Sequence, residues 1–115
     1  MPFSLTPHHL VAMYELCRAL FPRNWRLPPG EEVEFRASPR TDVCGKWNGS
    51  DPHVIIVSYS HHTNKDFLAA LYSMAHEAVH LVEDIAGKPP GHGAGFKRRI
   101  KIVARVLGCH EKDLA

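Results

Sequence analysis

The sequence predicts one α+β domain, in which an N-terminal helix, a long second helix and a C-terminal helix surround a small three-stranded sheet, mostly antiparallel or mixed. Three observations predict this class. The chain has 115 residues, enough for about one domain, which we place over residues 1–115. Apolar residues recur at helical spacing in three segments, and strand-like segments separated by turn residues lie between the first two.

The first helix is expected over Thr6 to Phe21. Thr6 can cap its N-terminus, and Pro7 suits the first helical position because it has no amide hydrogen to leave unpaired. Pro22 ends the helix.

Three strands are expected next. Glu32 to Ala37 alternates apolar and charged residues, as a half-exposed strand does. Val43 to Trp47 is a second candidate, and the turn sequence NGSDP separates it from the third. His53 to Tyr59 is β-branched and apolar, which favours a buried strand.

Two helices complete the chain. Thr63 and Asp66 resemble a capping box, and the apolar residues that follow repeat at helical spacing for about twenty residues until Gly87. A last helix is expected over Phe96 to Leu107, with Gly108 as its end.

Composition excludes several classes of protein. Cys17, Cys44 and Cys109 are odd in number and far apart, which argues against a disulfide framework and against a cysteine-ligated zinc ribbon. The N-terminus is a poor signal peptide, and no stretch approaches the roughly 20 apolar residues of a membrane helix. We therefore expect a cytoplasmic protein with reduced thiols and no membrane partner.

The most informative motif is HEAVH, which lies within the predicted second helix. Residues four apart lie on one helical face, so His76 and His80 can direct their imidazoles to one point. Glu77 is offset by about 100° and can hold a metal-bound water without occupying the metal. This spacing is typical of a zinc hydrolase, in which the glutamate accepts a proton as water attacks a carbonyl.

A catalytic zinc needs a third protein ligand, and His92 is the best candidate. It follows a segment that can turn the chain back, and Gly91 and Gly93 on either side allow a close backbone approach. The residues thus predict one zinc ion held by His76, His80 and His92. The simpler alternative is that these histidines are ordinary surface or core residues. The weaker candidates for the third ligand are His8, His9, His53, His61, His62 and His110.

Two further groups of side chains have open interpretations. The last helix carries five cations that could contact DNA phosphates or could form an ordinary solvated face: Lys97, Arg98, Arg99, Lys101 and Arg105. Glu83 and Asp84 lie within about a turn of His80 and could accept a hydrogen bond from a ligand imidazole.

The segment HEAVHLVEDIAGKPPGHGAGFKRRIKIVARVLG resembles the SprT-like zinc metallopeptidases, the family that includes the Spartan DNA–protein crosslink proteases. The shared pattern is His76, Glu77 and His80, then His92, Gly93 and Phe96. The resemblance implies a zincin-like fold and peptide-bond hydrolysis by a zinc-bound water, with DNA-associated proteins as one class of substrate. It also implies that the strand His53 to Tyr59 is the sheet edge with which a peptide substrate pairs. The four-cysteine zinc ribbon that many relatives carry is missing from these 115 residues.

Two alternatives remain. One is a regulatory peptidase resembling the ImmA/IrrE group, whose third ligand is usually acidic. The other is a non-catalytic, zinc-containing module that binds DNA. Substitution of Glu77 by glutamine separates these hypotheses, because it should abolish cleavage only in an enzyme.

Overall fold

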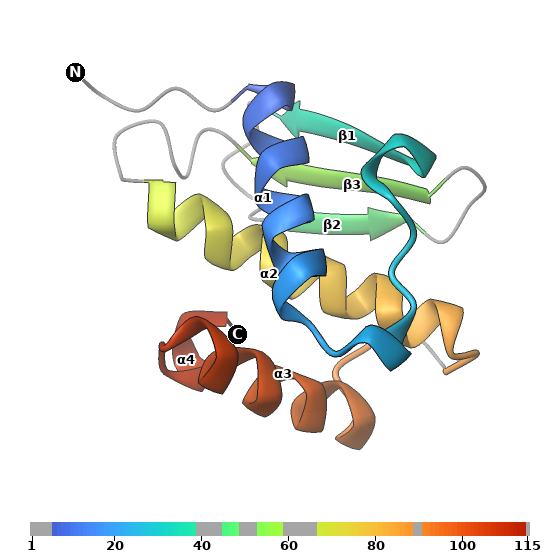
Figure 1. Cartoon of the computed structure of the whole chain (residues 1–115), viewed down its shortest axis with the longest axis vertical. Helices are drawn as coiled ribbons and strands as arrows, with labels where there is room; N and C mark the ends of the chain where they lie inside the picture. The colour runs from blue at the N-terminus through green and yellow to red at the C-terminus, as the bar shows by residue number, and fades with distance from the viewer. Residues whose placement is uncertain (1–5, 39–44, 49–52, 59–66, 89–90, 115) are drawn as a thin grey trace.

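The fold of the chain, taken from a computed structural model, is described over residues 6–38, 45–48, 53–58, 67–88 and 91–114. It is an α+β arrangement in which long helices lie against a small sheet (Figure 1). In chain order the main elements are α1 (Pro7–Leu20), β1 (Val33–Ser38), β2 (Gly45–Asn48), β3 (His53–Ser58), α2 (Phe67–Ile85), α3 (Ala94–Leu107) and α4 (Glu111–Leu114). Two short 3₁₀ turns, Arg23–Trp25 and Gly30–Glu32, connect α1 to β1.

The sheet is mixed and has the strand order β1-β3-β2. β1 runs parallel to β3, with Phe35 opposite Ile55, whereas β2 runs antiparallel to β3, with Trp47 opposite the same residue. The three predicted strands therefore form, and the mixed alternative describes their pairing better than the mostly antiparallel one.

The prediction that His53 to Tyr59 forms a sheet edge is wrong for its described part. β3 is the central strand and is paired on both sides, so its backbone groups are already used by β1 and β2. Its residues suit this position: Ile55 and Val57 are fully buried and Val54 is 7% exposed, and β-branched apolar residues favour a buried strand.

Local capping chemistry sets the ends of the helices. The Thr6 hydroxyl accepts a hydrogen bond from the His9 backbone amide at 3.3 Å, as expected of an N-cap. Gly87 and Gly108 end α2 and α3 with positive φ angles of 74° and 72°, which glycine adopts without steric cost. α3 begins at Ala94, ahead of the expected Phe96. The predicted capping box at Thr63 and Asp66 lies outside the described residues.

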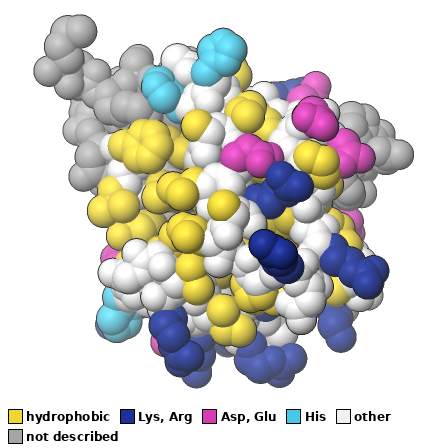
Figure 2. Space-filling view, in the orientation of Figure 1, with side chains coloured by type: hydrophobic (Ala, Val, Ile, Leu, Met, Phe, Trp, Pro, Cys, Tyr) yellow, Lys and Arg dark blue, Asp and Glu magenta, His cyan; other side chains and the backbone are white. Residues whose placement is uncertain are grey.

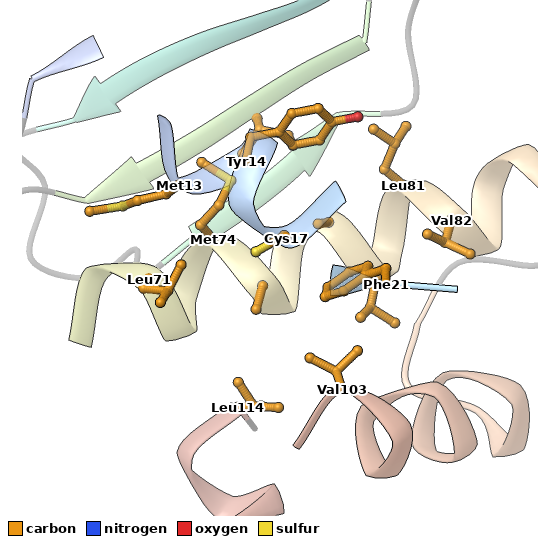
Figure 3. Packing of buried hydrophobic residues seen from close by; sticks show 14 of the residues in the cluster. Met13, Tyr14, Cys17, Phe21, Leu71, Met74, Leu81, Val82, Val103 and Leu114 are labelled. Atoms are coloured by element: carbon orange, nitrogen blue, oxygen red, sulfur yellow. The ribbon is translucent and has the colours of Figure 1, made fainter. Parts of the chain in front are cut away.

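α1 and α2 contact each other and share the sheet: α1 lies against β1, and α2 lies against β2 and β3. The core fills the space between these layers (Figure 3). Met13 and Tyr14 from α1 meet Met74 from α2, and all three are fully buried. On the other side α2 contacts α3 and α4. Of these two helices, α4 was not predicted from the sequence. None of the helices described is long and apolar enough to cross a membrane.

Candidate metal centre

The two histidines of the HEAVH motif lie on one face of α2, as their spacing predicts. The Nε2 atoms of His76 and His80 are 3.2 Å apart, and both side chains are half-buried. This face is turned away from the sheet, toward the loop before α3 and the end of α4. A helix held by packing on its other side therefore presents two nitrogen donors to one point.

The loop between α2 and α3 brings the third histidine to the same point. The Nε2 atom of His92 lies 3.1 Å from that of His80. Gly91 has a φ angle of 114°, a backbone conformation that side chains with a Cβ atom rarely adopt, so this glycine allows the chain to turn just before His92. The ligand atoms of His76, His80 and His92 all lie within 4.8 Å of one another, and the three residues could hold a metal ion.

The separation of these nitrogens fits a tetrahedral ion. Two imidazole nitrogens bound to one zinc at about 2.0–2.1 Å are about 3.3 Å apart when the geometry is tetrahedral. The two nitrogen separations at His80, 3.1 and 3.2 Å, are close to this value. Three neutral nitrogen donors also suit zinc chemically, and three protein ligands leave a fourth position for water or substrate.

Glu77 lies beside the histidines, with its carboxylate oxygen 3.8 Å from Nε2 of His76. The residue is only 3% exposed, and burial raises its pKa to about 8. The deprotonated form of such a group accepts a proton more readily than an ordinary glutamate, and a dication bound to the histidines would favour that form.

The ring nitrogens of the motif favour their neutral forms. Burial lowers the pKa of His76, and burial together with the neighbouring His76 and His92 lowers the pKa of His80 to about 4. Since only a neutral imidazole can bind a metal, protons compete less for these two ligands than for an ordinary histidine.

Phe96 supports all three rings from the first turn of α3. Its ring stacks on His92 with a centroid separation of 4.3 Å and an interplanar angle of 6°, and on His80 at 4.4 Å. It also makes an edge contact with His76 at 5.2 Å. Phe96 is 3% exposed, so this aromatic contact fixes the rings from the protein side.

The hydrogen-bond partner of His76 was missed by the sequence reasoning. The Nδ1 atom of His76 lies 2.5 Å from the backbone carbonyl oxygen of Leu114, to which it can donate a hydrogen bond, leaving Nε2 free to face the other histidines. Of the two carboxylates that the sequence suggested, Glu83 and Asp84, the first pairs with Arg99 instead. The one sequence signal that could have pointed to this contact is Leu114 itself, a large apolar residue in the otherwise polar segment EKDL.

The five cations of α3 do not form one uniform surface. Arg99 contacts Glu83 at 2.6 Å and lies over the ring of the buried Trp25 at 5.0 Å, so it holds α3 to the rest of the fold. That Arg99 contacts nucleic acid stays a prediction. The other four cations are exposed, and Lys and Arg side chains gather along the α3 edge of the molecule (Figure 2): Lys97, Arg98, Lys101 and Arg105.

Comparison of the sequence with protein-family models and with curated proteins finds no match.

Proposed function

We propose that this chain is a zinc-dependent metallopeptidase of the SprT-like type, with a zincin-like fold. The observation that carries the proposal is the convergence of three histidine nitrogens, 3.1 and 3.2 Å apart at His80, beside a buried carboxylate 3.8 Å from His76. A cluster that served only to prop the fold would have no need of that carboxylate. The histidine at position 92 also favours this type over a peptidase with an acidic third ligand.

Each side chain has a defined role in the proposed reaction. A zinc ion, when bound, supplies Lewis-acid chemistry that lowers the pKa of water toward about 7 and polarises a carbonyl. His76, His80 and His92 hold the ion, and Glu77 accepts a proton from the attacking water and delivers it to the leaving amine. The Leu114 carbonyl and the Phe96 ring keep the imidazoles in place.

The substrate is proposed to be a peptide or protein that binds in an extended form. Because β3 is central, pairing is proposed at β2, the outer strand that contacts α2. Main-chain pairing of this kind provides affinity with little sequence preference. A cytoplasmic setting and DNA-associated substrates remain parts of this proposal, since four exposed cations lie on α3.

The test is to compare zinc-loaded wild type with Glu77→Gln. Both proteins are incubated with unfolded casein, with and without single-stranded DNA, and the fragments are identified by mass spectrometry. Glu77→Gln should bind zinc and lose cleavage, whereas Glu31→Gln, the same change at an exposed glutamate, should cleave as wild type does. Equal cleavage by wild type and Glu77→Gln would contradict the assignment of the general base.

A further inference from the structure

A hollow of about 360 Å³ opens on the surface beside the histidine cluster, between α3 and α4. Its apolar part is formed by Phe96 and Ile100, which are 3% and 5% exposed. The volume lies at the small end of ligand pockets, which typically measure about 300–1,000 Å³. It is therefore suited to a side chain or a short peptide segment.

His92 joins this hollow to the metal centre. Its Nε2 atom points to the histidine cluster, and the same residue lines the hollow together with Phe96, on which its ring stacks. A single imidazole ring thus separates the two sites. A peptide whose carbonyl lay at the metal centre could place a neighbouring side chain in the hollow.

The charges around the hollow are mainly positive. Lys97, Lys101 and Lys112 line it, against the single carboxylate of Glu111. All four are exposed, and in the part of the chain that the structure describes no ion pair links any of the three lysines to a carboxylate. The hollow therefore offers a net positive charge next to apolar surface.

We propose that this hollow is a substrate subsite that receives an acidic side chain of the peptide, close to the scissile bond. A glutamate would lay its methylene groups on Phe96 and Ile100 and pair its carboxylate with Lys97 and Lys101. The inference rests on the proposed function and extends it to a class of substrate: acidic peptides.

Nucleic acid is the competing occupant of these lysines. Arg98 and Arg105, which a nucleic acid should also use, lie outside the hollow. The hollow beside His92 also carries the apolar surface of Phe96 and Ile100, which favours the methylene groups of a side chain over a polymer backbone.

The test measures binding rather than turnover, so that it stands apart from the test of cleavage. Short peptide hydroxamates that differ only in Glu or Gln at one position are titrated by calorimetry into the zinc-loaded protein. At the position whose side chain reaches the hollow, the Glu peptide should bind roughly tenfold more tightly than the Gln peptide, because its carboxylate pairs with the exposed Lys97 and Lys101. This preference should disappear in about 1 M salt, where the Debye length is about 3 Å.

Charge reversal provides the matched control. Lys101→Glu should abolish or invert the preference, whereas Arg98→Glu, the same reversal on the same helix but outside the hollow, should leave it unchanged. Equal binding of the Glu and Gln peptides at every position would overturn the proposal. The proposal would also be overturned if Lys101→Glu and Arg98→Glu weakened the binding of a labelled single-stranded oligonucleotide equally while no peptide preference was seen. If Glu77→Gln retains cleavage but the preference is present, only the assignment of the general base fails.

Discussion

Removal of residues 111–115 should weaken zinc binding although none of them belongs to the ligand set. The truncation removes the Leu114 carbonyl that lies 2.5 Å from His76 Nδ1. Loss of such a partner typically lowers metal affinity by about 10–100-fold, because the ligand ring loses its fixed tautomer and orientation. This factor corresponds to about 1.4–2.7 kcal/mol of binding free energy.

The truncation also removes a buried side chain, since Leu114 is 1% exposed, and this effect must be separated from the first. Leu114→Ala provides the separation because it keeps the backbone carbonyl. It should lower the free energy of unfolding by about 2–3 kcal/mol, measured in urea without zinc, and change zinc affinity by less than about threefold. The truncated chain should lose both zinc affinity and free energy of unfolding.

Zinc affinity is measured at pH 7.5 by competition with a chromophoric chelator, and helical content is checked by circular dichroism. The reasoning would be refuted if the truncated chain bound zinc as tightly as the full chain. It would also be refuted if Leu114→Ala and the truncation lost affinity equally, because the side chain rather than the carbonyl would then be responsible.

Three other changes have defined outcomes. His92→Ala should lose most of its zinc in elemental analysis, where we expect about one zinc per wild-type chain, whereas His8→Ala, at an exposed position of α1, should retain it. Metal-free Glu77→Gln should be more stable than wild type above pH 8. Because the pKa of Glu77 is raised from 4.5 to about 8 in the folded protein, folding binds a proton between these pH values. The wild-type free energy of unfolding, measured in urea, should therefore fall by up to several kcal/mol as pH rises through this range. Arg99→Leu should destabilise the fold by about 3 kcal/mol in the same assay at pH 7, because it leaves the 8%-exposed Glu83 unpaired.

The features that the sequence predicted correctly depend on short-range geometry. Thr6 and Pro7 begin α1, and Gly87 and Gly108 end helices, because capping is decided within a few residues. His76 and His80 share a face because of their spacing along one helix.

The features that were wrong or missed depend on contacts between distant segments. Strand order is decided by pairing across the sheet, so β3 was mistaken for an edge, although its continuous apolar run is typical of a central strand. The Leu114 carbonyl meets His76 across 38 positions of sequence. Arg99 did leave a local sign, since it lies one turn after the buried Phe96 and next to the buried Ile100, on the flank of the core stripe.

The histidine cluster that could hold a metal ion lies where three segments meet, and the rest of the fold holds each of them in a different way. α2 packs on the sheet, Phe96 and the Arg99–Glu83 pair fix the start of α3 to it, and Leu114 closes the other end. The imidazoles oppose this assembly when protonated, because His76 and His92 each lower the pKa of His80. Acid should therefore separate the loop at residue 92 from α2 before it unfolds the core, and a bound dication would counter this by replacing the protons. We therefore expect zinc binding and the docking of the C-terminal helices to stabilise each other.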